Sequence, residues 1–400
     1  MRYPGRIAIF SLLFLTSLVN ADHGSYPYAN QFRYWYPQSG TIFEQIKNDH
    51  CFDKYFTYLS RNQSIVNIDI IGGGDKYSVL TQPVIDCILN HTSDYIKNGM
   101  TSAQVLLGIM PTALALLGPS TVEMSMLANV ARRPLLALTL SAESPSVYFS
   151  RAFEYSEPHK ILALHKLRMR QWRPPNLSSE LLISGAEYAI AVGALANIAV
   201  INWQLGVGTI CAFWTDGIFA PTLWACLGII VHILGTVVLR MRLCGWRGRG
   251  EAPGAFIKEF SPDNTRPPPS RATRIWEWIQ GIPTRLSGIA KTEFIPSAAE
   301  RFDMRIKEFV ESKLFLFSAW ALSMFTIFHV IFGTLLFAST TFIGTLDALV
   351  IIGRYTASAA ACRIVLMYEL PGLQDSDLSD GMQGKRGDLV TVRTHVTAPI

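Results

Sequence analysis

The sequence has few charged residues. Of its 400 residues only 16% are Asp, Glu, Lys or Arg, whereas 50% are hydrophobic. Ordinary soluble domains carry about 25% charged residues, so roughly a third of the expected charge is missing. This deficit argues against a cytosolic globular enzyme and against a disordered or coiled-coil chain. The net charge of +5 is too small to indicate nucleic-acid binding.

The sequence also lacks the motifs that identify common enzymes. It contains no Walker loop, no His-Glu-x-x-His, no Gly-x-Ser-x-Gly and no Cys-x-x-Cys, which are the patterns that hold phosphates, catalytic zinc, an activated serine or a redox pair. We therefore expect a protein that is not an enzyme, with no catalytic residue, no cofactor and no resident metal.

The first 21 residues have the layout of a cleaved secretory signal. Arg2 and Arg6 precede an apolar run of 13 residues over 7–19, and small or tolerated residues stand at the expected cleavage positions. The run is too short for a membrane span of about 20 residues. We expect residues 1–21 to be removed; an uncleaved anchor is the alternative.

Residues 22–102 are expected to form a small domain on the non-cytoplasmic side. Two sequons predict N-glycosylation at Asn62 and Asn90. The segment holds two cysteines, Cys51 and Cys87, and a disulfide between them would close a loop of about 37 residues and stabilise the domain by roughly 3–4 kcal/mol. The alternative is a pair of free buried thiols.

The chain has five apolar stretches of membrane-spanning length, so the predicted fold is an all-α membrane protein. The first contains Pro111 and Pro119 and is interpreted as one kinked helix, with a re-entrant hairpin as the alternative. The long apolar region after residue 313 must fold back near 339–341, because a single helix would be about 80 Å long against a bilayer of about 30 Å. The expected spans cover residues 103–127, 181–203, 218–239, 314–338 and 342–366.

The positive charges of the connections predict the orientation of these spans. Residues 129–180 carry eight Lys or Arg and residues 240–313 carry fourteen, whereas the short connections 202–217 and 339–341 carry none. Because positive residues near the membrane stay cytoplasmic, both basic loops and the tail, 367–400, are expected inside.

The second basic loop contains three further features. Pro267–Pro269 favours polyproline II, as a linker or as a site for a protein partner. Residues 273–290 alternate bulky apolar and basic side chains, which favours an interfacial helix on anionic inner-leaflet lipids. A capping-box pattern at residues 297–300 predicts a helix that continues into the fourth span.

Ionisable residues inside the spans are the best functional pointers, because burying them in a membrane is costly. Counting 1.5 Å per residue from the helix ends predicts an inner layer of Glu187, His232 and Arg354 and an outer layer of His329 and Asp347. The layers predict a Glu187–Arg354 pair. They indicate either a proton or ion pathway or buried contacts that fix the packing of the helices.

Residues 124–148 and 353–370, read with the signal, the short outer domain and the layout of the spans, resemble uncharacterised multi-pass membrane proteins of filamentous fungi. The resemblance implies class and location only. We expect a non-enzymatic sensor or scaffold of the secretory pathway, at the plasma membrane rather than internal membranes. The alternative is a small-solute or ion transporter. The partners expected are the lipid bilayer and the protein partner named above, and no nucleic acid.

Overall fold

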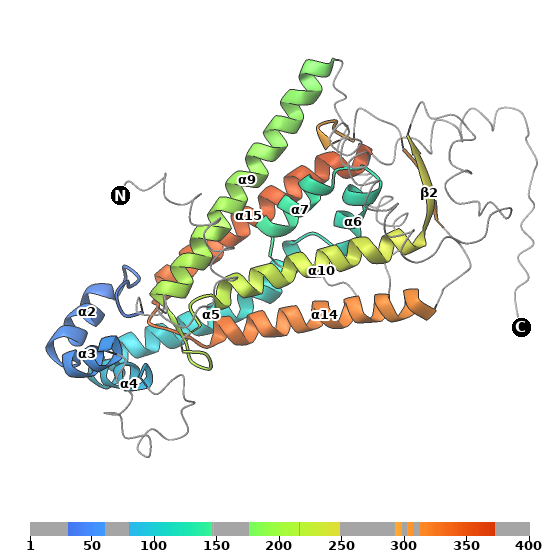
Figure 1. The fold of residues 1–400 in the computed structure, drawn as a ribbon. Helices are drawn as coiled ribbons and strands as arrows, with labels where there is room; N and C mark the ends of the chain where they lie inside the picture. Colours follow the sequence, from blue (N-terminus) through green and yellow to red (C-terminus); the bar gives the residue numbers. More distant parts are fainter. Residues whose placement is uncertain are drawn as a thin grey trace, which may run out of the picture.

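The structure is a computed structural model, and the fold is an all-α multi-pass membrane protein. The residues that it describes are 31–60, 80–145, 147, 176–215, 217–248, 293–297, 302–306 and 313–372. Five helices are long and apolar enough to cross a membrane, as the sequence predicted. They form one elongated bundle (Figure 1) and are α5 (Asp94–Leu117), α9 (Leu177–Gly208), α10 (Ala220–Arg242), α14 (Lys313–Ala338) and α15 (Thr345–Gly372).

The two ends of the bundle are different in kind. The N-terminal domain and the short connections 209–219 and 339–344 lie at one end, here called the domain end. The helix ends that lead into the two basic connections lie at the opposite end (Figure 1). The five long helices alternate in direction along the bundle, so the N-terminal domain and the end of α15 lie at opposite ends (Figure 1).

Where the structure describes the N-terminal domain, it has three short helices, namely α2 (Gly40–Asp49), α3 (Phe52–Ser60) and α4 (Gln82–His91). The predicted bond between Cys51 and Cys87 is present, with Cα atoms 5.9 Å apart. It joins the start of α3 to the middle of α4. Phe32, Phe43 and Ile88 pack beside it in a core that leaves each of them almost fully buried.

The domain is docked on the bundle through the two short connections. Strands β1 (Ile210–Cys211) and β4 (Thr340–Thr341) pair antiparallel, which joins these connections to each other. The next residue, Phe342, has a φ of 65°, a conformation that costs energy for a bulky side chain. It is held because its ring enters the domain core, where Trp35 and Phe43 lie 5.5 and 5.3 Å away between ring centroids.

The expectation of one kinked helix over 103–127 is wrong. Helix α5 ends at Leu117, and a separate helix α6 (Thr121–Asn129) begins after Pro119. Ser120 accepts a hydrogen bond from the Glu123 amide, and the Glu123 carboxylate accepts one from the Ser120 amide. This capping box supplies partners for amides that a helix start leaves unpaired, so the chain stops and restarts at this point. The proline inside α5, Pro111, does not end the helix.

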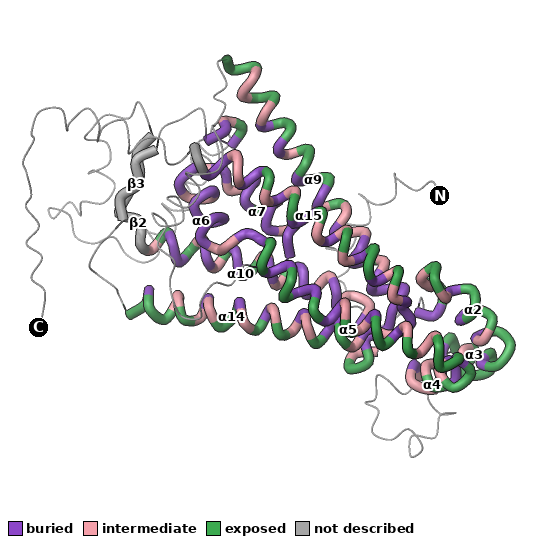
Figure 2. The backbone as a smooth tube through the Cα atoms, turned by 180° about the vertical axis from the view of Figure 1, so that it is seen from behind, coloured by how far each residue is buried: buried purple, intermediate pink, exposed green. Residues whose placement is uncertain are grey.

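Part of the predicted cytoplasmic loop 129–180 is packed inside the bundle. A second short helix, α7 (Pro134–Glu143), follows α6 directly, and the two lie beside α9, α10 and α15 in the half away from the domain end (Figure 2). Their inner faces are buried: Leu136 and Leu140 are 0% exposed. These helices complete the core in the half of the bundle that α5 does not reach.

A close helix crossing shapes the half of the bundle nearer the domain end. Trp224 on α10 is 0% exposed and packs on Phe337 and Tyr355. Gly333 on α14 makes room for it, because a Cβ there would meet the Trp224 indole nitrogen at 2.3 Å. The outward faces of the spans keep large apolar side chains exposed, including Phe317, Phe328 and Val350, which is typical of a surface that faces lipid.

Two predicted boundaries near the opposite end are wrong. Residues expected in a helix from 297 onwards include strand β3 (Phe302–Ile306), which pairs antiparallel with β2 (Leu243–Gly248). Helix α15 continues to Gly372, so the tail does not begin at residue 367. The signal at 1–21, Asn62, Pro267–Pro269, residues 273–290 and the tail from 373 lie outside the described residues.

Candidate functional site

The most concentrated group of charges in the interior surrounds Arg133. This residue lies between α6 and α7 and is 0% exposed. Its Nη1 atom lies 2.5 Å from Glu187 Oε2 on α9 and 2.9 Å from Glu369 Oε1 on α15. Both glutamates are buried as well. A guanidinium in this position offsets the cost of burying two carboxylates, which is large when they are unpaired.

The remaining donors of Arg133 bind a second residue of α9 and extend the group to the segment 293–297. Nη2 donates to Ser184 Oγ at 2.8 Å, and Nε donates to the Glu293 carbonyl oxygen at 2.8 Å. Arginine presents its donors in a rigid fork, and here the fork joins α9, α15 and the segment 293–297. We call Arg133, Ser184, Glu187, Tyr188, Glu293, Ser297 and Glu369 the arginine cluster.

The carboxylates of the arginine cluster also bind backbone and hydroxyl groups. Glu293 Oε1 accepts hydrogen bonds from the Leu136 amide at 2.8 Å and from the Tyr188 hydroxyl at 2.5 Å. Ser297 donates its amide to Glu369 at 3.3 Å. Residues 293–297 are thereby fixed to α7, α9 and α15, so the end of the second basic loop is part of the packed structure.

The arginine cluster holds more negative than positive charge. Three carboxyl groups, those of Glu187, Glu293 and Glu369, stand against one guanidinium. Within the described residues, Glu187 Oε1 and Glu293 Oε2 are buried without a hydrogen-bond donor. Glu187 and Glu369 lie close together, because both approach the same Nη1 atom of Arg133. One shared proton would offset part of the excess charge, as in other close carboxyl pairs.

The predicted pairing of Glu187 with Arg354 is wrong. Arg354 lies in the half nearer the domain end, where Nε donates to Asn197 Oδ1 at 2.9 Å and Nη1 donates to Gln204 Oε1 at 2.7 Å. Neutral amides on α9 satisfy its guanidinium. Glu187 is ten residues away along α9 and binds Arg133 instead.

The two buried histidines are neighbours and do not belong to separate layers. The His329 ring stacks on Trp224 with centroids 5.3 Å apart, and its Nε2 donates to the Trp224 carbonyl oxygen at 3.0 Å. Gly228, one turn before His232 on α10, lies beside the His329 ring, because a Cβ there would be 3.4 Å from His329 Nε2. Its ring is buried, and neither nitrogen has a partner among the residues that the structure describes.

Asp347, the other residue of the predicted outer layer, lies at the domain end. The backbone amide of Gln38 donates a hydrogen bond to Asp347 Oδ2 at 3.1 Å. The side-chain oxygen Oε1 of Gln38 accepts a hydrogen bond from the backbone amide of Leu346 at 2.9 Å. These two bonds attach the N-terminal domain to the first turn of α15. Asp347 is therefore a docking contact, and it does not share a site with His329.

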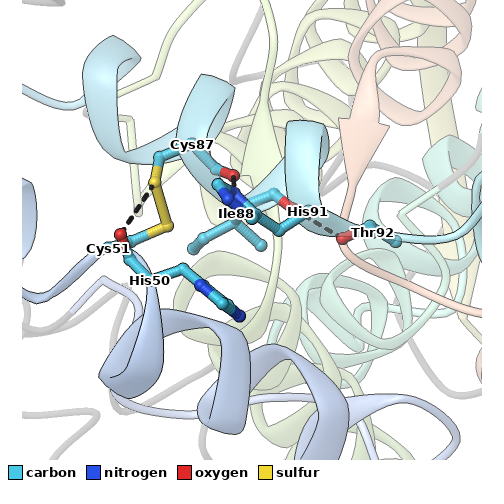
Figure 3. Close-up of a disulfide and its surroundings, with 6 residues drawn as sticks. All are labelled: His50, Cys51, Cys87, Ile88, His91 and Thr92. Carbon is cyan, nitrogen blue, oxygen red and sulfur yellow. Dashed lines mark hydrogen bonds between the residues drawn. A yellow bond between two sulfur atoms is a disulfide. The ribbon is translucent and has the colours of Figure 1, made fainter.

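Of the two predicted sequons, one is described. Asn90 is exposed in the last turn of α4, while Thr92 is buried and donates its hydroxyl to the Ile88 carbonyl oxygen (Figure 3). Glycosylation at both positions stays a prediction.

Sequence reasoning missed Arg133, Glu293 and Glu369. In the layout expected from the sequence, Arg133 falls in the basic cytoplasmic loop 129–180 and Glu369 in the tail. A signal for Glu369 exists in the sequence, because it continues the stripe of Ser358, Cys362 and Val365 at helical spacing. All four are buried on one face of α15.

Comparison with known protein families, curated proteins and solved structures finds no match for this chain. The similarity to fungal membrane proteins stays a prediction, and a functional assignment has to come from the site itself.

Proposed function

We propose that this chain is a non-enzymatic membrane sensor or scaffold that links its N-terminal domain to segments at the opposite end of the bundle. The observation that carries the proposal is that α15 is bound by different parts of the chain at both ends. Gln38 of the N-terminal domain binds its first turn. Arg133 and Ser297 bind Glu369 in its last two turns.

The length and burial of α15 make it a suitable connection. Its 28 residues correspond to about 42 Å of helix. Its inward face is buried from Ala348 to Leu370, and a packed helix moves as a unit rather than bending locally. A ligand that displaced the N-terminal domain would therefore change the position of Glu369. Segment 293–297 belongs to the second basic loop, and it would shift with Glu369 because Ser297 is hydrogen-bonded to that residue.

The proposed location is the plasma membrane, with the N-terminal domain on the outer face. The disulfide supports this orientation, because such bonds persist in oxidising compartments. The signal-like first segment and the basic loops support it as well.

A labelling experiment tests the connection. Phe294 is 50% exposed, so a cysteine placed there reports on segment 293–297. We expect Gln38→Ala to raise the rate of maleimide labelling at Phe294→Cys at least twofold, because it removes one bond to the first turn of α15. Gln45→Ala is the matched control, since Gln45 is exposed on α2. Equal rates in the two variants would contradict the proposal.

The buried histidines favour a transporter as the second candidate, because ionisable groups inside spans are typical of ion pathways and both ring nitrogens of His232 lack a partner among the described residues. The test is ion or proton flux into vesicles that contain the purified protein. We expect no flux above protein-free vesicles. Flux that His232→Ala abolishes would refute the sensor or scaffold assignment and establish transport.

A further inference from the structure

Arg354 on α15 is held by polar side chains of α9 in the half of the bundle nearer the domain end. The two helices lie side by side (Figure 1). Nε of Arg354 donates to Asn197 Oδ1 at 2.9 Å, and Nη1 donates to Gln204 Oε1 at 2.7 Å. Both acceptors are neutral amides, and Arg354 forms no ion pair with a carboxylate of the described residues. The guanidinium is therefore fixed in orientation but keeps its charge unbalanced.

One side of this guanidinium is open. Its remaining nitrogen, Nη2, has no acceptor among the residues that the structure describes and is not buried. Arginines inside spans extend toward the membrane surface, because an unbalanced charge in hydrocarbon is costly. Helical side chains lean toward the N-terminus of their helix, and α15 begins at the domain end. The partner Gln204 lies four residues before Gly208, the last residue of α9, which is about 6 Å of helix.

Exposed aromatic rings lie at the same level. Trp203 precedes Gln204 on α9 and is 52% exposed, and its ring centroid is 6.3 Å from that of Tyr34, which is 49% exposed. Exposed Trp and Tyr rings gather at the level of lipid headgroups, because each ring has an apolar body and a polar group. The pair indicates that Gln204 and the guanidinium bonded to it lie at headgroup level.

A carboxylate lies on the domain-end side of the guanidinium. Asp347 is seven residues before Arg354, which places the two on one face of α15, about 10 Å apart along the helix. The Gln38 amide binds Oδ2 of Asp347, whereas Oδ1 has no donor among the described residues and is not buried. The charges along this face are therefore positive at the deeper position and negative toward the domain end.

We propose that Arg354, Gln204 and Asp347 bind the headgroup of a zwitterionic phospholipid from the leaflet at the domain end. In phosphatidylcholine and phosphatidylethanolamine the phosphate is next to the glycerol, and the positive amine lies further out. This order complements the charges of the site. Two phosphate oxygens would accept from Nη1 and Nη2 of Arg354, a geometry that the guanidinium fork matches. The amine would lie toward Asp347, where phosphatidylglycerol carries no positive charge.

Lipid binding by the full-length protein in detergent tests the proposal. Protein washed free of lipid is titrated with phosphatidylcholine or with phosphatidylglycerol of the same acyl chains, and bound lipid is counted by native mass spectrometry. We expect one tightly bound phosphatidylcholine and at least fivefold weaker binding of phosphatidylglycerol. Arg354→Gln should weaken phosphatidylcholine binding at least tenfold. Lys54→Gln, which removes an exposed cation of α3, should leave it unchanged.

A second variant tests the order of charges without changing Arg354. Asp347→Asn removes the negative charge but keeps an oxygen acceptor for the Gln38 amide, so it should abolish the preference for phosphatidylcholine over phosphatidylglycerol. If Arg354→Gln does not fold, this comparison decides, and an unchanged preference in Asp347→Asn would overturn the proposal.

Three other results would also overturn it. One is equal binding of phosphatidylcholine by wild type and folded Arg354→Gln. Another is tighter binding of phosphatidylglycerol than of phosphatidylcholine by wild type. The third is displacement of the lipid by excess sodium phosphate, which would identify a site for the free anion.

Discussion

Replacing Arg133 by methionine should destabilise the bundle strongly. Its guanidinium lies between Glu187 and Glu369, at 2.5 and 2.9 Å, and all three side chains are buried. Removing one partner of a buried ion pair costs about 3–5 kcal/mol, because the remaining charge is left uncompensated. We expect Arg133→Met to lower the free energy of unfolding by that amount, as measured by titration with a denaturing detergent in mixed micelles.

A combined variant distinguishes loss of charge balance from loss of packing. Replacing both glutamates by glutamine together with Arg133→Met removes all three charges, and neutral replacements of buried ion pairs are often tolerated. The triple variant should therefore be more stable than Arg133→Met alone. Arg240→Met is the control: Arg240 is exposed near the end of α10, and the expected loss is below about 1 kcal/mol. If Arg133→Met unfolded like this control, or if the triple variant were the least stable, the assigned role of Arg133 would be refuted.

Two further predictions concern the crossing of α10 with α14 and the surface of α2. Gly333→Ala should lower the free energy of unfolding by about 1–3 kcal/mol, because its Cβ would collide with Trp224; Gly353→Ala, where a Cβ meets nothing within 4 Å, should change it little. Partial burial raises the pKa of Glu44, but the hydrogen bonds from Lys47 and Trp35 and the charge of Lys47 together outweigh it, and the pKa lies below its ordinary value of 4.5. The stabilising contribution is therefore present above pH 4.5 and lost as the pH falls further, so urea midpoints of wild type should drop more between pH 6 and pH 3 than those of Glu44→Gln. If the urea midpoints of wild type and Glu44→Gln fell in parallel between pH 6 and pH 3, this prediction would be contradicted.

The spans and the disulfide were predictable because they depend on local properties. A run of about 20 apolar residues identifies a span wherever its neighbours lie, and all five spans are present in the structure. Cys51 and Cys87 were the two cysteines of their segment, so their pairing needed no knowledge of the fold. The break after Leu117 was harder to predict. The capping box at Ser120 and Glu123 has a readable pattern, but apolar residues continue on both sides of it.

The polar contacts were not predictable from depth alone. Counting along a helix estimates how deep a residue lies, but not which helices are neighbours or where each helix ends. The estimate for α15 stopped at residue 366, two turns before its observed end. That error assigned Glu369 to the tail and left Arg354 as the nearest charge for Glu187.

The register of α9 against α15 explains why α6 and α7 enter the bundle. Asn197 on α9 bonds to Ser358 on α15 at 2.9 Å. Ten residues separate Glu187 from Asn197 and eleven separate Ser358 from Glu369, which is about 15–17 Å of helix in each case. The antiparallel register therefore brings Glu187 and Glu369 to the same level, where two carboxylates would repel each other. Neither helix carries a basic residue at that level to separate them, so a cation has to come from another element. The turn between α6 and α7 supplies it as Arg133, which makes the packing of these two helices a requirement of how α9 and α15 meet.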